Sequence, residues 1–257
     1  MQHRLLASLA AALLLAGCAT APQTPTASVP RYDKGMVSAA DPRAAEAGAQ
    51  VLREGGSATD AALTMLLALN VVEPQSSGIG GGGFLVLDDG RGTVETIDGR
   101  ETAPDAATPR WFEIGGKVLT TAQAIPGGLS VGVPGNLSLM EQAHARHGKL
   151  AWKRLFDPAI ALARDGFAIS PRMRQYLDRS RGTGAMTAEG RALYYGADGN
   201  PLPVGALVKN PALAAFLTRL ANEGAKAFYT GANAEAIAKA VSTAPRNPAP
   251  MTVADLA

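Results

Sequence analysis

A run of glycines between a helical and an extended segment strongly limits how this chain can fold. The stretch Gly78-Ile-Gly-Gly-Gly-Gly83 follows an apolar segment with helical periodicity and precedes the apolar-rich run Phe84–Asp88. The loop Asp89-Gly-Arg-Gly92 then leads to a second run, Thr93–Asp98, so the two runs predict a β-hairpin. Glycines at this density let a backbone approach another backbone or a ligand closely, because no Cβ stands in the way.

The same glycines imitate a nucleotide-binding pattern. Gly78, Gly80 and Gly83 fit the spacing G-x-G-x-x-G of the dinucleotide-binding fingerprint. That site requires a strand before the glycines and a helix after them, so that the pyrophosphate meets a helix N-terminus. Here the helical segment comes first and the strand second. The order therefore favours a tight packing turn over a nucleotide site.

The segments before the glycine run predict helices. Asp41-Pro42 is a typical helix start, because aspartate caps the N-terminus and proline is tolerated at the first position. Gly55-Gly56 would end this helix. Ser57 to Asp60 has the spacing of a capping box, and the helix 58–72 that it starts is apolar nearly all round, which predicts a buried central helix. The short apolar run 35–40 predicts a buried strand.

Further helices are predicted downstream. One runs from about Asn136 to His147 and is ended by Gly148, and others begin at Asp157-Pro158, Ser170-Pro171, Asn210-Pro211 and Asn233. Residues 183–205 are glycine-rich and predict a loop. Thr252-Val-Ala-Asp255 has the pattern of another helix start, and the chain ends two residues later. Because a helix needs more than one turn to form, we expect this chain to be part of a longer domain.

The first 17 residues have the pattern of a secretory leader. Arg4 precedes the apolar run 5–16, which is too short to cross a bilayer as a helix, since that requires about 20 residues. The following Leu15-Ala-Gly-Cys18 resembles a bacterial lipobox, in which the cysteine is lipidated after cleavage. An ordinary secretory signal with a chance cysteine is the alternative. Cys18 is the only cysteine in the chain, so an internal disulfide is excluded.

Residues 18–34 predict a disordered tether between this anchor and the domain. Prolines at 22, 25 and 30 stand among alanine, threonine and serine, which leaves little to bury. Because Ala19 rather than aspartate follows the cysteine, the resemblance to sorted lipoproteins indicates an exported periplasmic protein, held at the outer membrane by its lipid.

Charge and composition exclude one class of partner. Of 24 basic and 22 acidic residues, only Arg4 lies in the segment 1–17, so the processed chain would keep 23 basic and 22 acidic residues. Together with an aromatic content of 5%, this balance gives no reason to expect nucleic-acid binding. A hydrophobic fraction of 47% supports a real core, so 35–257 is expected to be one domain or a large part of one.

Several polar residues are candidates for catalysis or metal binding. Asp60 and Glu73 could act as catalytic carboxylates, but an aspartate at the third position of a helix more often stabilises its N-terminus. Glu141 and His144 form a Glu-x-x-His pair of the kind found in di-iron sites, which require two copies. The chain has one copy, so a solvated helix face is favoured, and we predict no metal and no cofactor.

A series of motifs runs through the chain after residue 34. The motifs are, in order, Gly55-Gly-Ser-Ala-Thr-Asp-Ala-Ala62, Val72-Glu-Pro74, Ser77-Gly-Ile-Gly-Gly-Gly-Gly-Phe84, Asp98-Gly-Arg-Glu-Thr-Ala-Pro104, Val131-Gly-Val-Pro-Gly135, Gly148-Lys-Leu-Ala-Trp152, Pro158-Ala-Ile-Ala-Leu-Ala163 with Gly166-Phe167, Asn210-Pro211, Glu223-Gly-Ala-Lys-Ala-Phe-Tyr-Thr-Gly231 and Thr252-Val-Ala-Asp-Leu256. Their order and content resemble the N-terminal, large-subunit part of the γ-glutamyltransferases, or glutathione hydrolases.

The resemblance implies a fold and an activity. The fold would be the αββα sandwich of the N-terminal nucleophile hydrolases, an α+β class, incomplete here and helix-rich in this segment. The activity would be γ-glutamyl transfer or hydrolysis on glutathione-like compounds, with water, an amino acid or a dipeptide as acceptor. Runner-up activities within the fold are those of a cephalosporin acylase and a poly-γ-glutamate processing enzyme. A non-catalytic lipoprotein remnant is the alternative of a different class.

The resemblance also implies where the catalytic threonine lies. Family precursors cleave themselves before a threonine, conventionally in a Thr-Thr-His context, and that threonine then acts as nucleophile with its own α-amino group as base. The only Thr-Thr pair here, Thr120-Thr121, precedes Ala122. The resemblance therefore places the nucleophile and the small subunit beyond this chain, which would hold no catalytic residue and be inactive alone.

Arg100 is the substrate-binding residue that the resemblance carries over. In Asp98-Gly-Arg-Glu-Thr-Ala-Pro104 it matches the family arginine that binds the α-carboxylate of the γ-glutamyl group. A guanidinium is always charged and offers a planar fork to a carboxylate. The alternative is a surface arginine paired with Glu101 or Asp98.

Overall fold

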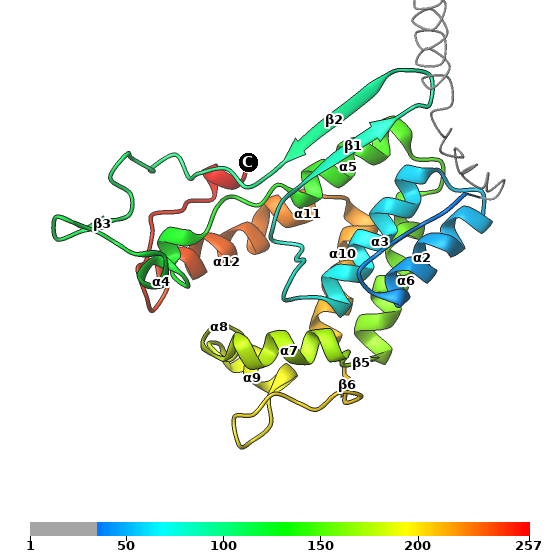
Figure 1. Ribbon diagram of the computed structural model, residues 1–257. Helices are drawn as coiled ribbons and strands as arrows, with labels where there is room; N and C mark the ends of the chain where they lie inside the picture. The colour runs from blue at the N-terminus through cyan, green and yellow to red at the C-terminus, as the bar shows by residue number, and fades with distance from the viewer. Residues whose placement is uncertain (1–34) are drawn as a thin grey trace, which may run out of the picture. The chain divides into compact units, whose positions relative to one another are not determined.

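The computed structural model describes residues 35–257, and the predicted leader 1–17, Cys18 and the tether 18–34 lie outside the described residues. Helices are the main secondary structure of the described part, which also has three sheets of two strands each (Figure 1). None of the described helices is both long enough and apolar enough to cross a membrane. The helix-rich character expected for this segment is confirmed.

The first two helices begin where their capping residues predict. Helix α2 (Pro42–Arg53) starts after Asp41, whose side chain accepts a hydrogen bond from the backbone N–H of Arg43. Helix α3 (Ala58–Val72) starts after Ser57, which forms a reciprocal capping box with Asp60. Ten of the fifteen residues of α3 are buried, so the predicted central helix is confirmed.

The hydrophobic core lies around α3. Helix α3 contacts α2, α5 (Asn136–His147) and α6 (Trp152–Asp165), and α6 also contacts α10 (Pro211–Glu223). Large side chains from these helices are fully buried, among them Leu67, Met140, Phe156 and Leu217. The starts predicted at Asn136, Ser170-Pro171 and Asn210-Pro211 are confirmed.

Most of the other elements outside the hairpin are short, apart from α7 and α12. They are β3 (Glu113–Ile114), β4 (Lys117–Val118), α4 (Thr121–Ala124), η2 (Gly128–Ser130), β5 (Phe167–Ala168), α7 (Pro171–Arg179), α8 (Arg181–Gly184), α9 (Ala188–Tyr194), β6 (Leu207–Val208), α11 (Lys226–Tyr229), α12 (Gly231–Ser242) and η3 (Ala254–Leu256). The region 183–205, predicted as a loop, therefore contains all of α9 and the end of α8, so that prediction was too broad.

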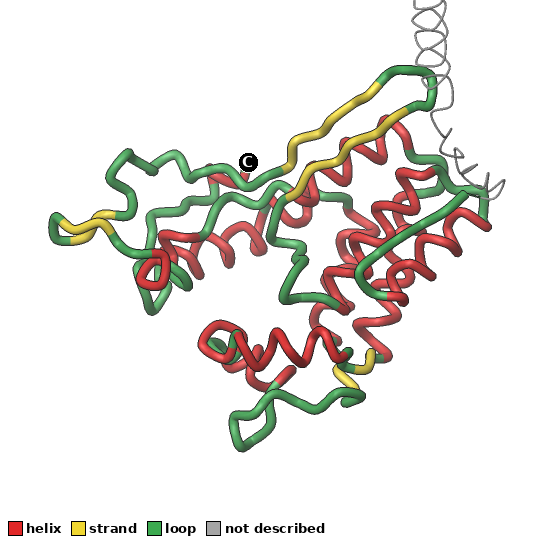
Figure 2. The backbone as a smooth tube through the Cα atoms, in the orientation of Figure 1, coloured by secondary structure: helices red, strands yellow, loops and turns green. Residues whose placement is uncertain are grey.

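The predicted hairpin is confirmed. Strand β1 (Gly83–Asp88) pairs antiparallel with β2 (Val94–Gly99) (Figure 2). In this pairing Phe84 lies opposite Asp98. One face of the hairpin packs on α5 and buries Ile97. The other face leaves large apolar side chains uncovered within the described residues: Phe84, Val86 and Val94 are 70%, 67% and 60% exposed.

Three local predictions were wrong. Residues 35–40 do not form a strand, because no described segment pairs with them and the backbone hydrogen bonds of a strand need a partner. Pro158 lies inside α6, which begins six residues earlier at Trp152. Asn233 lies inside α12, which begins at Gly231, and its side chain donates to the carbonyl oxygen of Phe228 instead of capping the helix.

Packing explains the early start of α6. Trp152 donates its indole N–H to the carbonyl oxygen of Leu220 and stacks edge-on against Phe156, with ring centroids 4.9 Å apart. A proline inside a helix removes one backbone hydrogen bond and crowds the carbonyl four residues earlier. The indole hydrogen bond of Trp152 and the complete burial of Leu155 and Phe156 offset that cost, and local sequence rules do not include such tertiary contacts.

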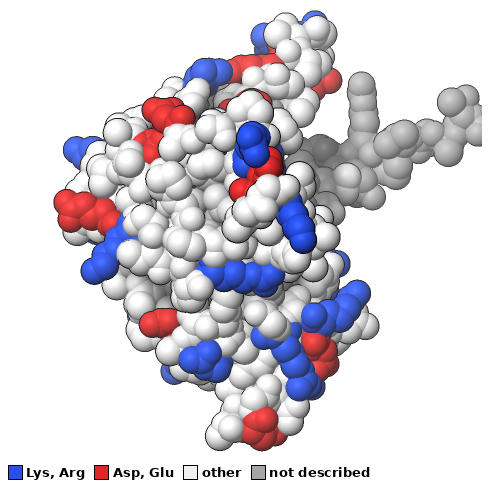
Figure 3. Space-filling view, turned by 90° about the vertical axis from the view of Figure 1, so that its left-hand side faces the viewer, with Lys and Arg blue, Asp and Glu red and all other residues white. Residues whose placement is uncertain are grey.

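Charged side chains on the face shown in Figure 3 are interspersed. Lysine and arginine lie among aspartate and glutamate, separated by uncharged surface. This distribution agrees with the near-neutral charge of the chain.

Candidate functional site

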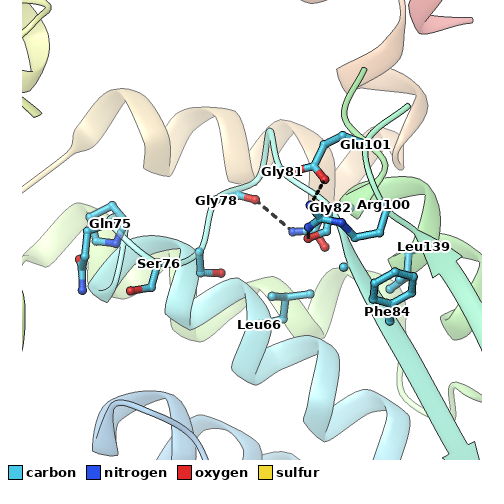
Figure 4. Close-up of a pocket in the computed structure, with 14 residues that line it drawn as sticks. Leu66, Gln75, Ser76, Gly78, Gly81, Gly82, Phe84, Arg100, Glu101 and Leu139 are labelled. Atoms are coloured by element: carbon cyan, nitrogen blue, oxygen red, sulfur yellow. Dashed lines mark hydrogen bonds and ion pairs between the residues drawn. The ribbon is translucent and has the colours of Figure 1, made fainter. Parts of the chain in front are cut away.

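Arg100 follows directly after β2 and lines a cavity of about 480 Å³ (Figure 4). The turn at the end of β2 is fixed locally, because the backbone N–H of Arg100 donates to Oδ1 of Asp98 at 2.9 Å. The side chain of Arg100 is 53% exposed. The sequence motif therefore places a cation at the edge of a cavity and not inside the core.

Two contacts hold the guanidinium of Arg100 in place. Its Nη1 donates to the carbonyl oxygen of Gly82 at 3.3 Å, and its Nη2 lies 3.0 Å from Oε2 of Glu101 (Figure 4). Arginine has five N–H donors, so these contacts leave donors for a ligand. The pair with Glu101, which the sequence left as an alternative, is present together with the cavity. Asp98 accepts from the backbone of Arg100 and not from its guanidinium.

The cavity combines this cation with polar and apolar walls. Gly81 to Gly83 and Asn136 form one part of the wall, and Leu66 and Leu139 add apolar surface. Gln75 and Ser76 lie at the end of the cavity away from Arg100 (Figure 4). Small-molecule sites have this composition, with apolar walls and a few polar groups that fix orientation.

A second cavity of about 400 Å³ also reaches Arg100. Its lining includes the carboxylates of Asp98 and Asp255, together with Ser138 and Tyr229. Two carboxylates against one guanidinium repel a negatively charged ligand, whereas the first cavity has Glu101 alone against Arg100. The first cavity is therefore the better site for a carboxylate.

Asp60 is a structural residue. It is fully buried, and one carboxylate oxygen accepts backbone N–H groups from Ser57 at 2.8 Å, Lys149 at 2.9 Å and Leu150 at 3.1 Å. Burial raises the pKa of Asp60, but these backbone hydrogen bonds outweigh that effect and hold the pKa below its usual value. Asp60 lines neither cavity at Arg100 and joins α3 to the loop before α6.

Glu73 is also structural. Its side chain is buried at the end of α3, where Oε2 accepts from Nε of Arg172 at 2.9 Å and from the amide of Gln75 at 3.0 Å. The ion pair joins α3 to α7. A catalytic role for Glu73 has no support in these contacts.

The Glu-x-x-His pair on α5 does not converge on one point. Glu141 accepts the backbone N–H of Ala225 at 3.1 Å, whereas Nε2 of His144 lies 2.8 Å from the carbonyl oxygen of Leu150. His147 contacts Oε2 of Glu95 at 2.8 Å. Within residues 35–257 no group of three His, Cys, Asp or Glu side chains is placed to hold a metal ion. Glu141 is exposed, whereas His144 and His147 are half-buried. All three side chains make tertiary contacts, so the expected solvated face is only partly right.

Sequence reasoning missed two residues of the cavity. Asn136 was identified only as a helix start, yet its side-chain amide donates to the carbonyl oxygen of Gly78 at 3.0 Å and lines the cavity. Gln75 was not singled out, and no local pattern marks it. The contact between Asn136 and Gly78 joins segments 58 positions apart in the chain, so only the fold reveals it.

Comparisons with known proteins identify a family for this chain. The sequence model of the family described as Gamma-glutamyltranspeptidase matches residues 44–257. Glutathione hydrolase 3 of Arabidopsis thaliana is 40% identical over 216 residues, which are 82% of this chain and 32% of that protein. The glutathione hydrolase proenzyme of Bacillus subtilis is 38% identical, over 80% of this chain and 35% of that protein. The chain thus spans about a third of the length of these curated relatives.

Solved structures show the same likeness in three dimensions. The γ-glutamyltranspeptidase of Helicobacter pylori matches with a TM-score of 0.82 and 34% identity, covering 89% of this chain and 64% of that one. The predicted fold class, a helix-rich part of the α+β fold of these hydrolases, is confirmed by this likeness. Given the sequence matches and the structural match together, the chain belongs to the γ-glutamyltranspeptidase family.

Proposed function

We propose that this chain is the N-terminal part of an enzyme that transfers or hydrolyses the γ-glutamyl group of glutathione-like compounds. The observation that carries the proposal is Arg100, a cation at the edge of a cavity of about 480 Å³, in a chain of this family. A guanidinium forms two parallel hydrogen bonds with a carboxylate. Arg100 would hold the α-carboxylate of the γ-glutamyl group in this way.

The reaction requires a threonine that we place outside this chain. Its hydroxyl attacks the γ-carbonyl while its own α-amino group takes the hydroxyl proton. The ammonium group then gives this proton to the leaving amine as the bond between the amine and the γ-carbonyl carbon breaks, which leaves an acyl-enzyme. Water, an amino acid or a dipeptide then accepts the glutamyl group. The described residues would contribute orientation: Arg100 fixes one end of the donor, and Glu101 holds the guanidinium at 3.0 Å.

The threonine would begin a small subunit cut from the same precursor. The uncovered face of the hairpin supports this partner, because Phe84, Val86 and Val94 are all at least 60% exposed. Three large apolar side chains on one face of a two-stranded sheet are typical of a surface that another chain covers. The small subunit would pack there.

The direct test uses the complete protein that carries this chain. We expect it to split into two polypeptides that purify together, to release p-nitroaniline from γ-glutamyl-p-nitroanilide and to release glutamate from glutathione. Residues 35–257 expressed alone should release neither product. A complete protein that stays intact and inactive would leave the non-catalytic lipoprotein as the explanation. Turnover confined to a cephalosporin or to poly-γ-glutamate would assign one of the runner-up activities.

We also propose that the protein is exported and anchored by lipid. Residues 1–17 would be removed as a signal peptide, Cys18 would carry the lipid, and 18–34 would act as the tether at the periplasmic side of the outer membrane. The proposal rests on sequence patterns only: Arg4 with the apolar run 5–16, the lipobox-like Leu15-Ala-Gly-Cys18, and the proline-containing stretch that follows. All of these residues lie outside the described part of the chain.

Replacing Cys18 with serine should release the protein from the membrane fraction and leave its activity unchanged. The hydroxyl cannot take the thioether-linked lipid, and the tether separates the anchor from the domain. Cell fractionation followed by immunoblotting measures the distribution. Ala27→Ser in the same tether is the matched control and should remain with membranes. A Cys18→Ser protein that still sediments with membranes would contradict lipidation.

A further inference from the structure

Three glycines from three segments meet at the backbone of Arg100. Gly99 precedes it at the end of β2, Gly82 comes from the glycine run, and Gly135 stands just before α5. A Cβ at Gly82 would lie 2.5 Å from the carbonyl oxygen of Gly99 and 2.8 Å from Cα of Arg100. A Cβ at Gly135 would lie 2.8 Å from the carbonyl oxygen of Arg100 and closer still to Gly99. Gly82 and Gly135 therefore both touch the Gly99–Arg100 backbone at distances that admit no side chain.

Hydrogen bonds hold these three segments together. The carbonyl oxygen of Gly81 accepts the backbone N–H of Gly135 at 3.2 Å and that of Asn136 at 3.0 Å. The side chain of Asn136 donates to the carbonyl oxygen of Gly78 at 3.0 Å. The carbonyl oxygen of Gly82 accepts Nη1 of Arg100 at 3.3 Å. The glycine run thus contacts both the backbone of Arg100 and its guanidinium.

We propose that Gly82 and Gly135 are positioning residues that set the direction of the Arg100 guanidinium toward the substrate carboxylate. The inference rests on the proposed role of Arg100 and adds the residues that fix its geometry. Productive binding requires placement within about 0.5 Å, and a misplacement of about 1 Å costs on the order of 100-fold in rate. A methyl group at Gly82 would have to push the glycine run off Arg100 by that amount.

Other glycines of the same run have no such requirement. A Cβ at Gly78, Gly80 or Gly83 would meet no atom within 4 Å. None of the three is recorded in the left-handed region that favours glycine. If the run served only as a flexible connection, alanine would have the same effect at every position. Gly80 lines neither cavity at Arg100 and is the matched control.

The test measures two donors with the complete enzyme. One is γ-glutamyl-p-nitroanilide, and the other is 4-aminobutyryl-p-nitroanilide, which lacks the α-carboxylate. Gly82→Ala should lower kcat/KM for the γ-glutamyl donor roughly 30- to 100-fold. It should change kcat/KM for the 4-aminobutyryl donor less than about threefold, because only the γ-glutamyl donor has a carboxylate for Arg100 to bind. Gly80→Ala should leave both within about twofold.

A double-mutant cycle gives a second readout that a general structural role would not move. In an Arg100→Ala background, Gly82→Ala should lower kcat/KM for the γ-glutamyl donor by less than about a further threefold. The reason is that Gly82 acts by positioning the Arg100 side chain, which this background lacks. If Gly82→Ala does not fold, Asn136→Ala serves instead. It removes the bond to Gly78 and should cost roughly 3- to 10-fold for the γ-glutamyl donor only.

Equal losses for both donors, or an undiminished effect of Gly82→Ala in the Arg100→Ala background, would overturn the positioning role. So would a Gly80→Ala variant as impaired as Gly82→Ala. Failure of the proposed function itself is distinguishable. It would show as a wild-type enzyme without γ-glutamyl turnover, or as an Arg100→Ala enzyme with normal kcat/KM.

Discussion

Replacing Arg100 with alanine is expected to lower kcat/KM for γ-glutamyl substrates roughly 10- to 150-fold in the complete enzyme. A hydrogen bond to a charged group contributes on the order of 1.5–3 kcal/mol, and about 1.4 kcal/mol corresponds to a factor of ten. Arg100→Lys should recover only part of the loss, because an ammonium cannot make two parallel bonds to a carboxylate. Steady-state kinetics with γ-glutamyl-p-nitroanilide measure both variants.

Stability should change little in the same variants. The pair with Glu101 is half exposed, and such pairs contribute less than about 1 kcal/mol. Arg91→Ala, an exposed arginine in the turn of the same hairpin, is the control and should behave like the wild type in both assays. An Arg100→Ala enzyme with normal kcat/KM, or one that does not fold, would contradict the role of Arg100 as a substrate-binding residue.

Asp60→Ala is expected to destabilise the folded protein by at least about 3 kcal/mol. The substitution leaves the backbone N–H groups of Ser57, Lys149 and Leu150 without their acceptor, and each buried unsatisfied donor costs about 1–3 kcal/mol. For a domain of this size the loss corresponds to a fall in Tm of about 6–12 °C. Thermal unfolding followed by circular dichroism measures the change.

Two further variants sharpen this experiment. Asp60→Asn keeps one oxygen acceptor but brings an N–H₂ group, so its loss should be smaller than that of Asp60→Ala. Asp157→Ala, which removes an exposed carboxylate 3.5 Å from Arg154, should change stability by less than about 1 kcal/mol. If the Tm of Asp60→Ala falls no more than that of Asp157→Ala, the backbone hydrogen bonds to Asp60 do not stabilise the protein by the expected amount.

The pH dependence of stability should also change at Asp60. Its pKa in the folded protein lies below the usual value of 3.8, because the backbone hydrogen bonds outweigh burial. A lowered folded pKa stabilises the protein above about pH 4, and this contribution is lost as the pH falls through the folded pKa. Asp60→Asn should therefore show a weaker loss of stability between about pH 4 and pH 2 than the wild type. Equal acid dependence in both proteins would contradict this contribution.

Local chemistry in the sequence was enough to predict several elements. Asp41 and Ser57 cap the first two helices because their side chains satisfy N–H groups within three residues, which needs no tertiary contact. The hairpin β1–β2 was predicted for a similar reason, since two apolar runs and the loop between them contain all of its pairing partners. The family motif around Arg100 identified the cavity residue without any coordinates.

Local rules failed where a distant contact decides the outcome. Asp157-Pro158 resembles a helix start, but packing of Trp152 extends α6 to begin earlier. Residues 35–40 have the composition of a strand, yet no described segment lies where it could pair with them. Local propensity favours one conformation of a short segment over another by a small free energy. The free energy gained by burying large side chains can be greater, and the segment then takes the conformation that allows the burial.

The sequence by itself therefore determined the helix caps, the hairpin and the cation at its end, because each depends on neighbours within a few residues. Only the tertiary structure decided that Gly82 and Gly135 enclose the backbone of Arg100, that Asn136 fastens the glycine run, and which cavity suits a carboxylate. These contacts join segments separated by 17 or more positions along the chain, whose approach depends on the packing of α3 and α5. The spacing of residues in the sequence does not predict that packing, because the packing depends on many buried contacts between distant segments.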